Sequence, residues 1–418
     1  MAHKKKLLTI FSIVFVDLLG FGLLIPLIPF FAKSFEASDT VVGLLVASYA
    51  AAQLVGAPVL GRLSDKYGRR PILLLSIFGT ILSLLLLGFA DALWLLFLSR
   101  ILDGLTGGNI TVAQAYITDI TDEKNRAKGL GLIGAAFGLG FIIGPVFGGL
   151  LSSVGANITA GSLVWAYALP AFVAATLASL NWLAIYFWLP ESRTVAQRDE
   201  AMANPGKRVF SLQALRVAFA RPLVGPLLKT RFVFSLAFAT FQTIFPLYAL
   251  NRLGLEAAQT AFVLAYVGVL IAFIQGVLIG RLTARFDEKS LILASVVLMT
   301  ASLLAWAFTP SVPILLLVLA PLALAGGVFN TVINSQLTKV VAAQEIGGTL
   351  GLSASLESGT RVIAPTMGGV LLDLLGAWAP GAVGAMLTAV LIPYVWQHIS
   401  AKSWPMLTGG QSYESAKS

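Results

Sequence analysis

Long apolar stretches separated by short polar segments follow one another along almost the whole chain. Each is long enough to cross a hydrocarbon core of about 30 Å as a helix that rises 1.5 Å per residue. Because the bilayer interior offers the backbone no water to bond, each crossing is expected to be α-helical. The pattern predicts twelve spans, at residues 7–31, 41–60, 72–90, 94–118, 128–151, 166–189, 229–251, 258–279, 290–309, 312–337, 347–372 and 379–399.

The sequence repeats itself, which indicates two similar halves. GRLSDKYGRRPILL, which begins at Gly61, is echoed by GRLTARFDEKSLIL at Gly280, an offset of 219 residues. The pair Gly107-Gly108 returns as Gly326-Gly327 at the same offset, and GPVFGGLL in the fifth span returns as APTMGGVLL in the eleventh. Several matches in one order at one spacing are typical of internally repeated transporters.

The repeat and the polar segments together predict the domain organisation. We expect an N-terminal six-helix bundle at 1–190, a cytoplasmic linker at 191–228, a C-terminal six-helix bundle at 229–400 and a cytoplasmic tail at 401–418. Within the linker, the sequence FSLQALRVAFAR carries apolar residues with helical spacing. It predicts a short helix that lies at the membrane surface.

Composition and charge place the chain in a lipid bilayer. Apolar residues make up 57% of the 418 residues and charged ones 11%, which is far from a soluble domain. A net charge of +9 would suit a nucleic-acid ligand, but its distribution argues against one. With the N-terminus in the cytoplasm, all but four of the 28 Lys and Arg residues fall on cytoplasmic segments; the exceptions are Lys33, Arg252, Arg100 and Arg361. This asymmetry is the positive-inside pattern, and it places both termini in the cytoplasm.

The same composition limits the chemistry. There is no cysteine, and the two histidines lie near the ends of the chain, so neither a metal site nor another cofactor is expected. The lipid bilayer is an expected partner. We expect a monomer that does not bind nucleic acid.

Five ionisable side chains lie well inside predicted spans, away from the span ends, where charge is costly and therefore marks function. Asp17, Asp103 and Glu357 are candidates for proton coupling. Arg100 stands three residues before Asp103 and Arg361 four residues after Glu357, so each arginine is a candidate charge partner on the same helix face. Two structural ion pairs without a role in coupling are the alternative.

Polar and aromatic side chains on the spans are candidates for a substrate cavity. The predicted set is Asn109, Gln114, Gln242, Phe241, Asn330 and Asn334. Tyr49, Phe245 and Tyr266 could stack on a planar organic ligand. Ordinary packing is the alternative for each aromatic ring.

Two segments are rich in glycine. In the loop after the second span, Gly61 and Gly68 permit a tight turn, and Asp65 can accept hydrogen bonds from exposed amides at a helix N-terminus. Arg69 and Arg70 follow directly. The alternative is that these charges only fix the topology.

The fifth span carries small residues and a proline that allow another backbone to approach closely: Gly140, Gly144, Pro145, Gly148 and Gly149.

These segments resemble known motifs. GRLSDKYGRR at 61–70 resembles the loop motif of the major facilitator superfamily, and the glycines of the fifth span resemble a pattern that marks antiporters in that superfamily. Two further matches are similar to its drug/proton antiporter branch: Asp17-x-x-Gly20-x-Gly22 and Arg100-x-x-x-Gly104-x-x-Gly107. With AYITDIT at 115–121, the chain looks most like the tetracycline/proton antiporter group.

The resemblance implies an all-α membrane protein of twelve helices in two pseudo-symmetric six-helix bundles. It implies a transporter rather than an enzyme, with protons and a small hydrophobic organic compound as its partners. Such a transporter exports a drug such as tetracycline against protons across the cytoplasmic membrane of a bacterium. It also implies a gating latch on the cytoplasmic side, in which Asp65 takes part and Arg69 or Arg70 reaches Asp119 or Asp122. The chain departs from the family at Asp103, where a small residue is usual.

Two other functions stay open at this point. A uniporter or symporter of the same fold would carry a sugar or other metabolite without the exchange that the glycines of the fifth span imply. A receptor or scaffold would move nothing, and the intramembrane charges and the internal repeat argue against it.

Overall fold

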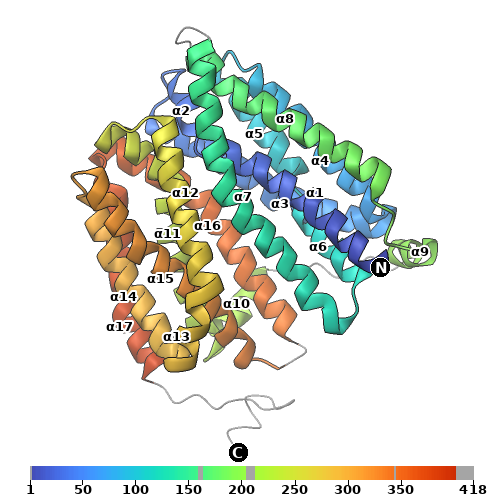
Figure 1. Ribbon diagram of the computed structural model, residues 1–418. Coiled ribbons are helices and arrows are strands. Elements are labelled where there is room, and N and C mark those ends of the chain that lie inside the picture. Colours follow the sequence, from blue (N-terminus) through green and yellow to red (C-terminus); the bar gives the residue numbers. More distant parts are fainter. Residues whose placement is uncertain (1, 159–162, 204–211, 343–344, 402–418) are drawn as a thin grey trace, which may run out of the picture. The chain divides into compact units, whose positions relative to one another are not determined.

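The computed structural model of the chain is all-helical in the residues that it describes, 2–158, 163–203, 212–342 and 345–401 (Figure 1). Almost all of the predicted tail at 401–418 lies outside these residues, as do positions 204–211 of the predicted linker.

Ten helices within the described residues are long and apolar enough to cross a membrane, where the sequence predicts twelve. The predicted span at 94–118 is divided into α5 (Leu93–Thr106) and α6 (Asn109–Ile120). The predicted span at 347–372 is present as the 30-residue helix α16 (Ile346–Leu375). It is not among the ten, because its polar and charged side chains make it less apolar than those helices.

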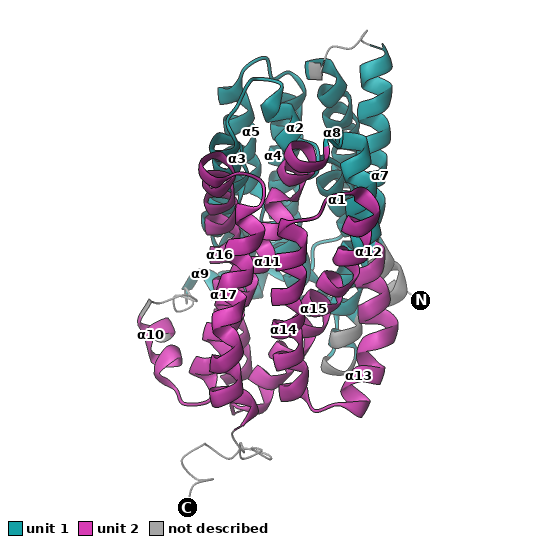
Figure 2. Cartoon of the chain, turned by 90° about the vertical axis from the view of Figure 1, so that its left-hand side faces the viewer, with its two compact units in different colours: residues 1–207, 254–268 teal, residues 208–253, 269–418 magenta. Residues whose placement is uncertain are grey.

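The chain forms two compact units (Figure 2). Unit 1 comprises residues 1–207 and 254–268, and unit 2 comprises residues 208–253 and 269–418. The first boundary falls inside the predicted linker. The segment 254–268 joins unit 1 because the start of α12 (Ala257–Phe273) packs against α7. There the Cβ that a larger residue would carry at Gly149 lies 3.0 Å from Ala261 and 3.1 Å from Ala258.

Unit 1 is built on the pairs α1 with α7, α4 with α8 and α3 with α5. Its helices, besides α5, α6 and the start of α12, are α1 (Ala2–Leu24), α2 (Ile28–Lys33), α3 (Asp39–Tyr67), α4 (Arg69–Gly88), α7 (Glu123–Ile158), α8 (Leu163–Trp188) and α9 (Val195–Ala203). In Figure 1, α1 runs beside α7.

Glycines bring the backbones of α1 and α7 together. A Cβ at Gly144 would lie 2.6 Å from the carbonyl carbon of Gly22, and one at Gly22 would lie 2.6 Å from the carbonyl oxygen of Gly140. At Gly148 a Cβ would run into the carbonyl oxygen of Leu23. Three of the predicted glycines of the fifth span therefore pack directly on the first, while Gly149 packs on α12 as described above.

Unit 2 has a large aromatic core. Its helices, besides the end of α12 and α16, are α10 (Leu212–Ala220), α11 (Val224–Leu253), the π-helical turn η1 (Ile274–Leu278), α13 (Ile279–Arg285), α14 (Glu288–Ala307), α15 (Val312–Lys339), α17 (Ala379–Val395) and a second π-helical turn, η3 (Trp396–Ser400). Trp306 is fully buried, with Phe241 in edge contact at 5.0 Å and Tyr248 at 4.6 Å between ring centroids. The Tyr248 hydroxyl donates to the Trp306 carbonyl at 2.6 Å.

The sequence repeat is visible in the helix boundaries. Helices α4 and α14 both have 20 residues, and Arg69 and Glu288, where they begin, stand at the repeat offset. Helices α5 and α15 begin at the same offset, at Leu93 and Val312. The two copies differ later, because α5 ends before Gly107-Gly108, whereas α15 continues through Gly326-Gly327.

The side chains around Gly107 explain this difference. A break in a helix frees backbone carbonyls that need other donors. Gln53 on α3 donates to the Gly107 carbonyl at 3.1 Å, and the Ser76 hydroxyl on α4 donates to the Thr106 carbonyl. The second repeat has Ala272 in place of Gln53, which cannot donate such a bond.

The short helix expected in the linker is present as α10, in unit 2. Arg221, directly after it, makes two hydrogen bonds to the Glu345 carboxylate, at 2.7 and 3.0 Å. The hydrogen bonds and charge of Arg221 lower the pKa of Glu345 below its usual value. Because both side chains are more than two-fifths exposed, this contact tethers α10 to the start of α16 with little effect on stability.

Because α1 and α7 approach closely, alanine should affect the stability of the protein very differently at two glycines of α7. Gly144→Ala should lower the free energy of unfolding by about 1–3 kcal/mol, because the new methyl group overlaps the backbone of Gly22. Gly138→Ala is the matched control, since nothing lies within 4 Å of a Cβ there and alanine favours a helix by up to about 1 kcal/mol. Unfolding of both variants in detergent measures the difference. Equal stability of the two would contradict the packing described.

Candidate functional site

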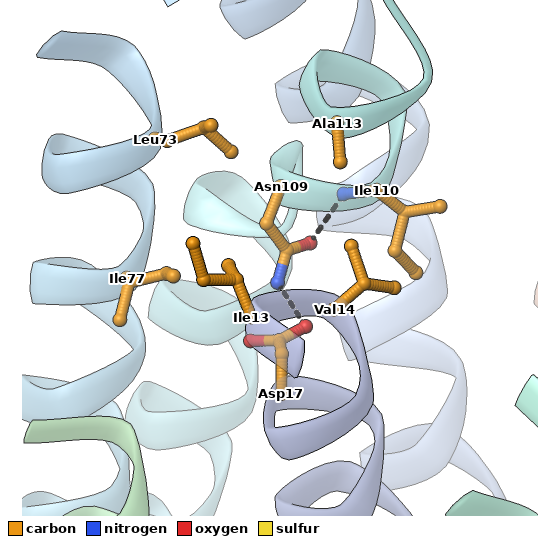
Figure 3. Close-up of a pocket in the computed structure, with 8 residues that line it drawn as sticks. All are labelled: Ile13, Val14, Asp17, Leu73, Ile77, Asn109, Ile110 and Ala113. Atoms are coloured by element: carbon orange, nitrogen blue, oxygen red, sulfur yellow. Dashed lines mark hydrogen bonds between the residues drawn. The ribbon is translucent and has the colours of Figure 1, made fainter. Parts of the chain in front are cut away.

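Asp17 lies in α1 inside the span Thr9–Lys33, with its carboxylate in a small cavity (Figure 3). Apolar side chains from α1, α4 and α6 surround it: Ile13, Val14, Leu73, Ile77, Ile110 and Ala113. The Nδ2 group of Asn109 donates a hydrogen bond to Asp17 Oδ2. The partner that holds Asp17 is thus a neutral amide.

The break between α5 and α6 places this amide. Asn109 is the first residue of α6, so its side chain leaves the helix end rather than a helix flank. Its Oδ1 accepts the backbone N–H of Ile110 at 2.9 Å, which leaves the NH₂ group to face Asp17. In Figure 3 the two side chains point toward one another across the cavity.

Arg100 and Asp103 form the predicted ion pair in α5. Arg100 Nη2 stands 3.2 Å from Asp103 Oδ2, and the two residues are 3% and 7% exposed. The guanidinium also lies over the ring of Tyr49 on α3, 5.6 Å from its centroid. Gln53 donates to the Tyr49 hydroxyl at 2.9 Å and so links this pair to the helix break. The charges of Arg100 and Asp103 cancel within one helix face.

Unit 2 holds a second charged cluster, on three helices, in which Arg231 is buried and Arg361 is exposed. Arg361 donates to Glu357 Oε1 at 3.0 Å, one turn away on α16. Arg231 on α11 donates to the other oxygen of Glu357 and, through Nη1, to Asn330 Oδ1 on α15 at 2.7 Å. Sequence reasoning missed Arg231 because it stands only two residues inside the predicted span 229–251 and was assigned to the cytoplasmic segment. In the structure α11 begins at Val224, and the Arg231 side chain is 5% exposed.

Residues on both sides of the turn between α3 and α4 form a network within unit 1. Arg69 Nε donates to Asp119 at the end of α6 at 2.9 Å, one of the alternatives that the resemblance implied, and its Nη1 donates to Ser64 at 2.7 Å. Arg69 also pairs with Asp65 at 2.9 Å. Arg70 lies apart from this network, with its guanidinium donating to the Tyr186 carbonyl at 2.6 Å.

Glu191, which sequence reasoning did not single out, ties the end of α8 to the start of α4. Its carboxylate accepts the backbone N–H groups of Arg69 at 2.9 Å and Arg70 at 3.1 Å, two of the amides that a helix start leaves without partners. Gly68 has φ +104°, and a Cβ there would collide with the Glu191 carboxylate. Arg193 extends the network by donating to the Asp65 carbonyl at 2.8 Å.

Comparison with known proteins identifies the chain. Residues 10–285, more than half of it, match the family model of the Major Facilitator Superfamily. The chain belongs to the major facilitator superfamily. It is therefore a multi-pass membrane protein and a secondary transporter of small molecules, not an enzyme.

Superfamily relatives extend over nearly the whole chain. The tetracycline resistance protein, class H, of Pasteurella multocida is 32% identical over 94% of this chain and 96% of its own length. Solute carrier family 22 member 18 of Rattus norvegicus is 31% identical, with 89% and 88% covered. The crystal structure of a bacterial homologue of the human lysosomal transporter Spinster, in its inward-facing and occupied conformation, aligns with a TM-score of 0.78 at 16% identity, covering 96% of this chain and 98% of that one. The major facilitator fold is thus shared.

The predicted cavity residues lie in different surroundings. Asn109 contacts Asp17 and Asn330 contacts Arg231, while Gln114 and Gln242 are exposed and Asn334 is partly buried. Phe241 and Phe245 are at most 1% exposed within the aromatic core of unit 2. Their contact with each other and the contact of Phe241 with Trp306 account for both rings as packing residues of this core. Tyr49 lies beside Arg100, and Tyr266 is partly buried on α12.

The Glu191 contacts predict a local role for this side chain in the transporter. Glu191→Ala should release the amides of Arg69 and Arg70 and weaken the start of α4 by about 1–2 kcal/mol, the usual effect of losing a helix cap. Hydrogen exchange should speed up at these two amides. Glu200→Ala, at an exposed position of α9, is the control. Unchanged protection of both amides in Glu191→Ala would show that the carboxylate does not cap the helix.

Proposed function

We propose that this superfamily member exports a hydrophobic organic compound, tetracycline-like in character, in exchange for protons, and that Asp17 carries the proton. The observation on which this rests is the setting of Asp17 in an apolar cavity, against a neutral amide. Alternating access then exposes this carboxyl group to one side of the membrane at a time.

A neutral partner suits a group that must hold and release a proton. The NH₂ group of Asn109 can donate to the carboxylate of Asp17 and also to the carbonyl oxygen of its protonated form, so neither state of Asp17 loses this partner. A guanidinium, in contrast, stabilises the ionised state alone. Asp103 and Glu357 each pair with arginine, so we assign them to charge balance rather than to the proton.

The predicted gating residues support the same cycle. Asp65, Arg69 and Asp119 fix the cytoplasmic ends of α3, α4 and α6 to one another. We propose that this network, with Glu191 behind it, moves as one rigid part of unit 1 when access changes. Gly68, with φ +104°, shapes the turn between α3 and α4, whereas Gly61 lies inside α3 and not in the turn as predicted. Arg70 anchors α4 to the end of α8.

The relatives support the class of compound and the location. The tetracycline resistance protein favours export of a planar, polycyclic drug, and its bacterial source favours the cytoplasmic membrane of a bacterium. The packing of Gly140, Gly144 and Gly148 on α1 supports exchange, because the motif of the antiporters holds the helix that carries Asp17.

Substitution of Asp17 tests the proposal. In liposomes with an imposed pH gradient, the native protein should accumulate tetracycline, whereas Asp17→Asn should fall to the level of empty liposomes. The asparagine keeps the size of the side chain but cannot bind a proton for transfer. Exchange of labelled for unlabelled tetracycline without a gradient should persist, since binding and reorientation are retained.

Asp91→Asn, at an exposed position between α4 and α5, is the matched control and should accumulate tetracycline as the native protein does. Full accumulation by Asp17→Asn would remove Asp17 from the coupling step. Transport by the native protein that ignores the pH gradient would favour a uniporter of the same fold.

A further inference from the structure

The cluster on α11, α15 and α16 carries an excess of positive charge. It combines two guanidinium groups, Arg231 and Arg361, with one carboxylate, Glu357, and one neutral amide, Asn330. Its formal charge is thus one positive unit. Proton coupling as proposed above uses none of these four residues, so their function is open.

The hydrogen bonds of the cluster are incomplete. The Arg231 side chain is only 5% exposed, and its buried Nε has no hydrogen-bond partner among the described residues. Arg361 uses Nη2 for Glu357, and its side chain is 62% exposed. A guanidinium has five N–H donors in a planar fork, so Arg361 presents further donors at the surface of unit 2.

The position of Arg361 within the membrane indicates what it faces. It lies near the middle of α16, with about half of the helix on either side. A charged group at this depth does not face lipid, because hydrocarbon penalises it by several kcal/mol. The exposed part of Arg361 is therefore expected to face water rather than lipid.

We propose that Arg361, with Arg231 behind it, binds an ionised acidic group of the transported compound, a carboxylate or an enolate. Guanidinium groups bind planar, delocalised anions through two parallel hydrogen bonds, which matches this class of group. Glu357 occupies the guanidinium donors in the absence of the compound, and the acidic group of the compound shares them. The proposal deepens the proposed function, on which it rests, by adding an acidic group to the compound that is carried.

Two matched dyes test the proposal by equilibrium binding. Rhodamine B is a polycyclic dye with a free carboxylate, and its ethyl ester has the same ring system without that charge. Fluorescence polarisation with the purified full-length protein in detergent measures both dissociation constants without a pH gradient. The native protein should bind the acid more tightly than the ester.

Substitutions within the cluster should then act on the acid alone. Arg361→Gln should weaken binding of the acid by roughly tenfold, the effect of about one charge-assisted hydrogen bond, and leave the ester within about twofold. Arg361→Lys should lie between, since it keeps the charge but loses the fork. Glu357→Gln should tighten binding of the acid, because it removes the competing carboxylate. Arg285→Gln, an exposed position of α13, is the control for loss of one positive charge.

The outcomes separate this proposal from the proton-coupled function. A preference for the acid that survives in Asp17→Asn supports the subsite even if that variant still transports. No binding of the acid, equal binding of both dyes by the native protein, or equal weakening of both by Arg361→Gln overturns it. Weaker binding of the acid by a folded Glu357→Gln variant also overturns it, because Glu357 would then hold the site together rather than compete. Circular dichroism and gel filtration verify that each variant folds.

Discussion

A charged side chain inside a bilayer is tolerated only with a partner or with water, and this constraint determines the chemistry of the transporter. Unit 1 meets it by joining Arg100 to Asp103, so that their charges cancel. Asp17 then depends on the neutral amide of Asn109. Unit 2 meets it by placing Glu357 against two arginines, which leaves one positive charge in excess. We propose that a proton is the missing partner of Asp17, and that an acidic group of the transported compound is the missing partner of the arginines in unit 2.

Backbone geometry makes the first of these arrangements possible. Asn109 reaches Asp17 because the helix breaks before it, and the break is stabilised by Gln53 and Ser76 from neighbouring helices. The glycines of α7 hold α1, and with it Asp17, by direct backbone contact. The glycine motif that is typical of antiporters thus packs directly on the helix that carries Asp17.

Local sequence patterns predicted much of this structure. Most helix boundaries follow from apolar runs, and the pairs Arg100–Asp103 and Glu357–Arg361 follow from spacings of three and four residues on a helix. The contact of Arg69 with Asp119 is one of the alternatives that the resemblance of the loop to a family motif implied. These features depend on neighbours in the sequence or on a familiar motif.

Other features depend on distant parts of the chain and could not be predicted in the same way. Glu191 caps α4 from more than a hundred residues away, and no local pattern marks it. Arg231 looked cytoplasmic because α11 begins earlier than its apolar run. Phe241 was predicted to line the substrate cavity, and the structure shows its ring packed against Trp306. Burial and long-range contacts decide the role of each.

The proton on Asp17 is the central claim, and infrared difference spectroscopy of the purified protein tests it most directly. The account predicts that tetracycline binding removes the carbonyl stretch of a protonated carboxyl group in the native protein, and that Asp17→Asn lacks this change. A spectrum in which the native protein and Asp17→Asn show the same carboxyl signals, before and after tetracycline is added, would contradict it.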